Sequence, residues 1–293
     1  MTELPADIKK RIDRFQPIET NGVTLYPILV DDMEEFLRCR AALEFLHQSL
    51  PVALMQIPLL TAFFQIEIAT SSSAPSAAEQ GGEREIKPIT FFSDAMVLLC
   101  RALRLGHGLT RDQLLEQRVL VLTDTENPTL LREVRFITDD AEVISIRPAT
   151  WKKLREIIAA QNGVQLEADD ANPELVYAER ALLAAKAPKI RFDLANKISW
   201  VAAMSHADEI EIYDWPILKF ERRADVIKRT LDYLMFGIGQ SSGMVSFKDG
   251  NPVPSPYYEK ITDSAAMQPL GEFASGAAQQ AVSMARAATQ SNN

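Results

Sequence analysis

The spacing of apolar residues changes along the chain, and each spacing predicts a type of element. Apolar and polar residues alternate around 23–30, which predicts a short strand. Asp31 follows, with Glu34 three positions further on, as in a capping box that begins a helix. Apolar residues then recur at helical spacing until Pro51, which ends the predicted helix.

The most apolar stretch, PVALMQIPLLTAFFQIEIA at 51–69, is almost long enough to cross a membrane. Four residues interrupt it, namely Gln56, Pro58, Gln65 and Glu67. Polar side chains at such positions are unfavourable in a helix surrounded by lipid. We therefore predict a buried pair of helices or one bent helix here, and no membrane span.

Residues 70–85, TSSSAPSAAEQGGERE, are small and mostly polar. Such a segment buries too little apolar surface to offset the entropy of ordering it, which predicts a linker or mobile loop. Beyond it, Ser93 or Asp94 is placed to cap a helix that runs to Leu105, and Thr110 is placed to cap a shorter one.

The pattern changes again at 118–147, RVLVLTDTENPTLLREVRFITDDAEVISIR. Three runs rich in β-branched and other apolar residues are separated by short stretches that contain Asp, Asn and Pro. Runs of this length between turn residues are typical of strands. We predict a small antiparallel meander.

Four helices are predicted between 150 and 236, because apolar residues again recur three and four positions apart. They begin at Thr150, at Pro173 in the first turn of NPELVYAERALLAA, in FDLANKISWVAAM, and after Asp214 as the cap of a long helix to Phe236. The predicted buried face of the second helix is Leu175, Ala178, Leu182 and Ala185. That of the last helix is Ile217, Phe220, Ala224, Ile227, Leu231 and Leu234.

Together these elements predict an α+β fold, a predominantly α-helical bundle with a small antiparallel β meander. We divide the chain into five segments. The first three are an N-terminal strand with a helical segment at 1–69, a linker or mobile loop at 70–85, and a segment of helices and β meander at 86–149. A C-terminal helical bundle with an extended Pro-rich arm at 150–260 and a mobile tail at 261–293 follow.

Composition excludes some classes of protein. The chain has 293 residues, a formal net charge of −9 and a pI near 5.0. An acidic protein does not bind nucleic acid non-specifically, because that requires a basic surface. The two cysteines, Cys39 and Cys100, lie in apolar helical stretches and are expected to be buried free thiols. The N-terminus lacks the apolar core of a secretory signal, so we expect a cytoplasmic protein.

No motif for a cofactor, a metal or catalysis is found. Gly237, Gly239 and Gly243 follow a predicted helix, whereas a phosphate-binding loop precedes one, so we interpret them as a helix stop and turn. The three histidines show no spacing typical of metal ligands. We expect no enzyme, no cofactor and no metal site. An alternative is a catalytic site assembled from dispersed residues around His206.

The segment MVSFKDGNPVPSPYYE, at 244–259, has a distinctive composition. Its prolines favour an extended conformation that has little entropy left to lose, and they lead to two neighbouring tyrosines. We take Phe247, Tyr257 and Tyr258 as candidate partner-binding residues of a docking arm. The equal alternative is that this arm packs against its own bundle.

Several of these stretches resemble, in order and spacing, proteins encoded in the tail-gene modules of bacteriophages and prophages. They are YPILVDDMEEFL near the N-terminus, WKKLREIIAAQN at 151–162, ANPEL at 171–175, KISWVAAMSH and WPILKF within 197–220, and DYLMFGIGQSSGMVSFKDGNPVPSPYYE at 232–259. The segment 70–85 and the alanine-rich tail are additions to that pattern. The resemblance implies a tail assembly chaperone or related protein that acts on the tape measure protein, with no catalytic residues.

We therefore expect a tail assembly chaperone or tail-morphogenesis factor in the bacterial host cytoplasm. Its partner would be a phage tape measure or tail tube protein, with no nucleic acid and no membrane, and a homo-oligomer is compatible with the sequence. The alternative is a permanent structural subunit of the virion, in the baseplate or the head–tail connector.

Overall fold

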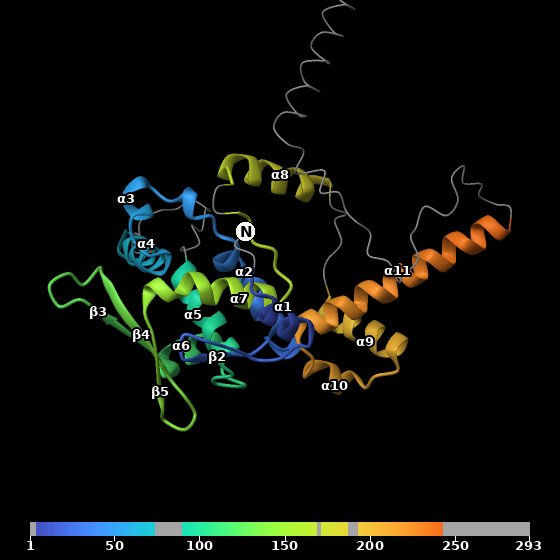
Figure 1. The fold of residues 1–293 in the computed structure, drawn as a ribbon, viewed down its shortest axis with the longest axis horizontal. Helices are drawn as coiled ribbons and strands as arrows, with labels where there is room; N and C mark the ends of the chain where they lie inside the picture. Colours follow the sequence, from blue (N-terminus) through green and yellow to red (C-terminus); the bar gives the residue numbers. More distant parts are fainter. Residues whose placement is uncertain (1–3, 74–89, 169–170, 187–192, 243–293) are drawn as a thin grey trace, which may run out of the picture. The chain divides into compact units, whose positions relative to one another are not determined.

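The computed structural model describes residues 4–73, 90–168, 171–186 and 193–242 (Figure 1). Most of these residues are helical, and the strands form two small antiparallel sheets. The predicted α+β class with a predominance of helix is thereby confirmed. Among the described residues, no helix combines the length and the apolar character needed to cross a membrane.

The elements follow one another in this order. The helices of the first half are α1 (Ala6–Asp13), α2 (Met33–Glu44), α3 (Val52–Met55), α4 (Leu59–Ser73), α5 (Phe91–Ala102) and α6 (Arg111–Arg118). Those of the second half are α7 (Trp151–Gln161), α8 (Pro173–Lys186), α9 (Leu194–Ser205), α10 (Glu209–Tyr213) and α11 (Ile217–Ser241). Short 3-10 turns are η1 (Val30–Asp32), η2 (His47–Ser49) and η3 (Pro148–Thr150).

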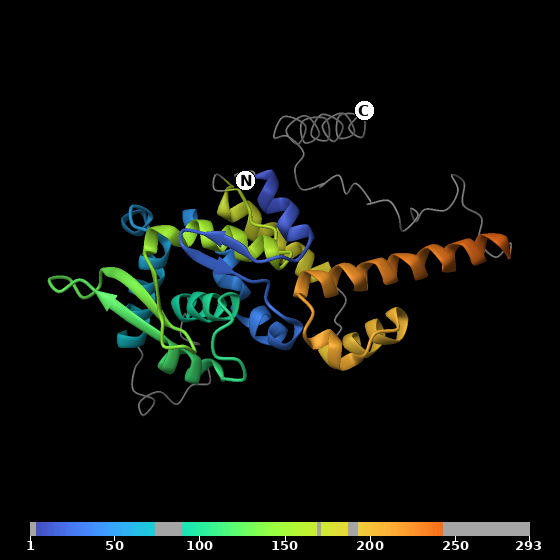
Figure 2. The same cartoon turned by 60° about the horizontal axis from the view of Figure 1, so that its bottom comes forward.

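The predicted meander consists of β3 (Val119–Thr123), β4 (Leu131–Ile137) and β5 (Val143–Ile146), paired in that order. Figure 2 shows it beside α6. A second, two-stranded sheet pairs β1 (Ile18–Thr20) with β2 (Val23–Leu25). Its turn is Asn21-Gly22, and both residues have positive φ, as a tight hairpin requires. The strand predicted at 23–30 is therefore shorter than expected, and its partner β1 was not predicted.

The capping box predicted for Asp31 and Glu34 is wrong. Asp32 occupies the N-cap of α2, and no side chain caps the helix there. The Asp32 carboxylate instead lies 3.2 Å from the Nε of Arg101, a residue of α5. The helix ends at Glu44, before the predicted Pro51, because Phe45 is extended.

The apolar stretch 51–69 forms the predicted pair of helices, α3 and α4, which are separated by residues 56–58. No residue of α3 is buried, so the predicted burial is found only within α4. Leu60 and Phe63 of α4 are fully buried. The helix continues to Ser73, four residues into the predicted linker 70–85, and 74–85 lies outside the described residues. A hydrogen bond from the Thr70 hydroxyl to the Ile66 carbonyl accompanies this continuation.

Helix α5 is buried almost along its whole length and packs against α2 and α4. It begins at Phe91, two residues before the predicted cap. The Glu67 carboxylate of α4 accepts hydrogen bonds from the backbone N–H groups of Phe92 and Ser93, both at 3.0 Å. A residue from another helix thus satisfies N–H groups that the first turn leaves without a partner.

The described residues of 1–178 and 187–227 form one compact unit, and those of 179–186 and 228–293 are grouped in a second. Within the first unit, the N-terminal and C-terminal segments share a core. The backbone N–H of Ile28 donates to the Asn162 side chain at 3.1 Å, and its carbonyl accepts from the N–H of Ile217 at 2.9 Å. The five-segment division made from the sequence stays a prediction.

Two expectations about the C-terminal helices are wrong. On α8, Leu175 and Leu182 were predicted to be buried, but they are exposed. On α11, the glycines were predicted to end the helix at Phe236, yet the helix continues through Gly237 and Gly239 to Ser241. The glycines therefore lie within a helix, and Gly243 lies outside the described residues.

Candidate protein-binding surface

Helix α11 carries an apolar stripe with regular spacing. Its members recur alternately three and four positions apart, the a and d positions of a heptad. They are Ile217, Phe220, Ala224, Ile227, Leu231, Leu234 and Ile238. One face of the helix is thus apolar along its whole length, and Figure 2 shows the helix as one unbroken ribbon.

The first half of this stripe lies in the core of the compact unit. Ile217, Phe220, Ala224 and Ile227 are all buried. Two ion pairs also connect this half to other helices. Lys197 of α9 lies 2.6 Å from the Glu221 carboxylate, and Arg222 lies 2.9 Å from the Asp13 carboxylate of α1. The Lys197 ammonium also lies 5.3 Å from the centre of the Phe220 ring. The predicted burial of the stripe is confirmed as far as Ile227.

The second half of the stripe is less covered, because Leu231 is half-buried and the members after it are exposed. Leu234 is 51% exposed and Ile238 is 68% exposed, and the neighbouring Met235 is 70% exposed. Exposed apolar side chains scattered singly are ordinary in proteins, but a contiguous row on one helix face is typical of an interaction surface. We name Leu231, Leu234, Met235 and Ile238 the distal stripe.

The distal stripe also lacks charge. From Tyr233 to Ser241 the sequence YLMFGIGQS contains no charged residue. Charged side chains are depleted at the centre of protein interfaces, where aromatic residues and methionine are enriched. This part of α11 therefore has the composition of an interface core.

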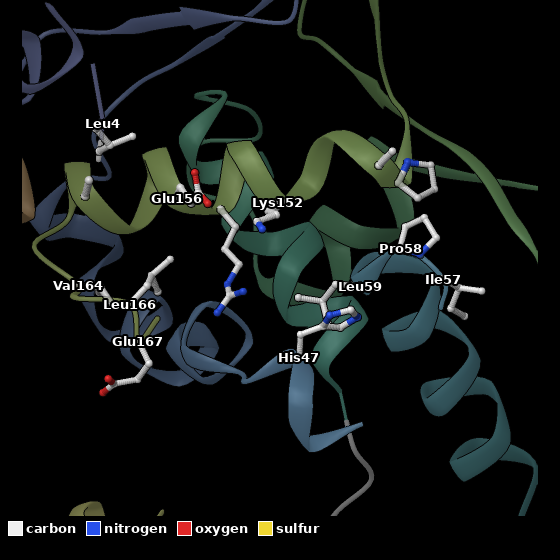
Figure 3. A pocket seen from close by; sticks show the side chains of 14 residues that line it. Leu4, His47, Ile57, Pro58, Leu59, Lys152, Glu156, Val164, Leu166 and Glu167 are labelled. Atoms are coloured by element: carbon white, nitrogen blue, oxygen red, sulfur yellow. The ribbon is translucent and has the colours of Figure 1, made fainter. Parts of the chain in front are cut away.

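A cavity of about 610 Å³ lies elsewhere in the compact unit (Figure 3). Its walls come from η2, the α3–α4 turn, η3, α7 and the segment that follows α7. The lining is mainly apolar, with the charged residues Lys152, Arg155, Glu156 and Glu167. In Figure 3, Glu167 points away from the other labelled side chains.

Two polar side chains of this cavity have clear structural positions. Arg155 is buried and donates a hydrogen bond to the carbonyl of Phe45 at 2.7 Å and another to that of Leu43. It thus binds carbonyls at the C-terminal end of α2, which is a structural task. The Nε2 atom of His47 is buried and has no hydrogen-bond partner among the residues that the structure describes.

The cavity lining carries several ionisable side chains. Its described residues include two acidic and two basic residues with one histidine, and no Ser, Thr, Cys or Tyr. His206, the centre of the alternative catalytic hypothesis, is exposed at the left-handed C-cap of α9 and does not line this cavity. Within the described part of the chain, no three His, Cys, Asp or Glu residues group as metal ligands. We base no catalytic proposal on these residues.

Both cysteines are fully buried, as predicted. Burial disfavours the thiolate and raises the pKa of Cys39 and of Cys100 to about 12. At about pH 8 almost no thiolate is then present. We expect Ellman's reagent to leave both thiols unmodified in the folded protein and to modify both after denaturation. Rapid modification of either thiol in the folded protein would contradict this account.

The candidate partner-binding residues Phe247, Tyr257 and Tyr258 lie outside the described residues. They stay predictions. Sequence periodicity had placed Leu234 on a buried face, and the signal that could have corrected this was the loss of charge after Asp232.

Comparison of the chain with protein-family models, curated proteins and solved structures gives no match. The resemblance to phage tail-module proteins stays a prediction.

Proposed function

We propose that the protein is a phage tail assembly chaperone or tail-morphogenesis factor that acts in the bacterial host cytoplasm. It would bind a tape measure or tail tube protein through its helical C-terminal half, without a cofactor and without catalysis. The observation that carries the binding role is the exposed, uncharged distal stripe of α11. The tail-specific part rests on the quoted sequence resemblance.

The physical basis is helix-to-helix recognition of an apolar client. A tape measure protein is expected to be long and helical, and its apolar helix faces must be shielded from water until the tail assembles. An exposed row of Leu, Met and Ile is an apolar surface against which such a face can pack, and both surfaces lose water on binding. The net charge of −9 would make loaded complexes repel one another, which favours solubility.

Co-expression tests this function. The full chain carrying an affinity tag is produced with the tape measure protein or the tail tube protein of the same phage genome. We expect one of them to co-purify and to accumulate in soluble form only in the presence of the tagged chain. Failure of both to co-purify, with the tagged chain folded, would remove the proposal.

Purified particles distinguish a chaperone from the alternative. A chaperone leaves before the particle is complete, so mass spectrometry of purified virions should not detect it. If the chain is found at the stoichiometry of a baseplate or connector protein, the function becomes that of a permanent virion subunit. The distal stripe would then be a contact within the particle.

A further inference from the structure

The cavity that η2, the α3–α4 turn, η3 and α7 enclose has the size of a small-molecule site (Figure 3). Its volume of about 610 Å³ lies within the range of clefts that bind ligands in proteins. Pro58, Ala149 and Lys152 are exposed members of its lining, whereas Pro148 and Val164 are buried ones. The cavity therefore opens to solvent where the exposed residues lie, and a ligand can enter it there.

The walls of this cavity are held by contacts of their own. Arg155 joins α7 to the C-terminal end of α2 through its hydrogen bond to the Phe45 carbonyl at 2.7 Å. At the end of α7, the Asn162 side chain accepts a hydrogen bond from the N–H of Ile28 at 3.1 Å. The α3–α4 turn contributes Pro58, whose ring restricts the backbone. Walls fixed in this way need little reordering when a ligand binds, which favours affinity.

The apolar part of the lining favours an aliphatic ligand. It includes the aliphatic side chains of Ile57, Leu59, Ala160, Val164 and Leu166. No Phe, Tyr or Trp occurs among the described lining residues, so ring stacking would not contribute to binding. The favourable free energy would come from apolar surface that leaves water, in proportion to its area.

The charged lining residues favour a ligand without net charge. Two of them are basic, Lys152 and Arg155, and two are acidic, Glu156 and Glu167, so their formal charges cancel. An ionic ligand would move from water to mainly apolar surroundings that carry no net opposite charge, which is unfavourable. A neutral hydroxyl group can both donate and accept a hydrogen bond, so it suits side chains of either sign.

We propose that this cavity binds a neutral aliphatic molecule that carries one hydroxyl group. The aliphatic part would lie against the apolar lining, and the hydroxyl group would lie near the exposed Lys152. The site goes beyond the proposed function, which uses the distal stripe and no residue of this cavity.

Isothermal titration calorimetry of the full chain with octan-1-ol, octanoate and octylammonium tests the ligand class. The three probes share one apolar chain and differ in the charge of the end group. We expect octan-1-ol to bind at one site per chain, at least about fivefold more tightly than either ion. Tighter or equal binding of either ion would overturn the neutral ligand, and the absence of saturable octan-1-ol binding would overturn the site. This series uses the wild-type chain, so it does not depend on the folding of a variant.

Two tryptophan variants test the location. Ala149→Trp places a large side chain at the exposed side of the cavity, and Lys153→Trp is the matched control, because Lys153 is exposed on α7 and is not among the described lining residues. We expect at least about a tenfold loss of octan-1-ol affinity for Ala149→Trp and none for the control. Equal affinities of the two folded variants would overturn the proposal.

The distal stripe is the other apolar surface on which octan-1-ol could bind. Leu234→Glu combined with Ile238→Glu should therefore bind octan-1-ol with wild-type affinity. A loss of binding in this variant, with the chain folded, would place the ligand on the distal stripe and overturn the proposal.

Discussion

Phe220→Ala is expected to lower the free energy of unfolding by about 3–5 kcal/mol. The Phe220 ring is fully buried in the first half of the α11 stripe. Its removal loses the transfer free energy of the ring and leaves a cavity that the surrounding side chains fill only in part. Urea denaturation followed by circular dichroism measures the change as a lower midpoint at an unchanged slope.

Ile238→Ala is the matched control, because Ile238 continues the same stripe on the same helix. Its side chain is 68% exposed, so folding of one chain buries little of it, and the expected change is below about 0.5 kcal/mol. This control is measured at a concentration at which the chain is monomeric. Equal losses for the two variants would show that the distal half is part of the core, and would contradict the division of the stripe at Ile227.

Arg101→Met is expected to cost about 3–5 kcal/mol of unfolding free energy. Arg101 is only 8% exposed and forms a hydrogen bond with Glu35 at 2.7 Å. It also donates to the backbone carbonyls of Gly106 at 3.1 Å and Leu109 at 2.9 Å. Asp32 completes the cluster, and burial raises the pKa of its carboxyl group. Methionine keeps the bulk but leaves two carboxylates and two carbonyls without this partner.

The control for Arg101 is Arg38→Met, which removes an ion pair with Glu34 on the same helix α2 as Glu35. Both members of that pair are largely exposed, so the expected change is within about 0.5 kcal/mol. Thermal unfolding of the three proteins at one pH gives the comparison. A loss for Arg101→Met no larger than that for Arg38→Met would show that the buried cluster contributes little to stability.

Much of the fold follows from local patterns. The meander was predicted because its strands are rich in β-branched and other apolar residues between turn residues. The capping box of Asp31 and Glu34 was mispredicted because Val30–Asp32 form a 3-10 turn, which makes Asp32 the N-cap of α2, and the Asp32 carboxylate lies beside Arg101, 69 positions later. Such a long-range ion pair leaves no trace in the spacing of neighbouring residues.

The errors on α11 have a different cause. Periodicity shows that a helix has one apolar face. It does not show at which residue the rest of the chain stops packing against that face, so Leu234 was placed in the core. The helix stop at Phe236 rested on glycine propensity, which is a weak guide when the neighbouring residues continue the helix. The candidate binding residues Phe247, Tyr257 and Tyr258 lie beyond Ser242, outside the described residues, and stay predictions.

The central claim is that the distal stripe binds the tail protein. Its most direct test is the amount of tape measure or tail tube protein that co-purifies with Leu234→Glu combined with Ile238→Glu, relative to wild type. The control is Val52→Glu combined with Ile210→Glu, which places two glutamates at apolar positions that are 74% and 77% exposed. We predict at least a tenfold loss for the first variant, because buried charges in an apolar seam are costly, and none for the control. Wild-type recovery by the distal variant, with the wild-type complex itself present, would contradict the account.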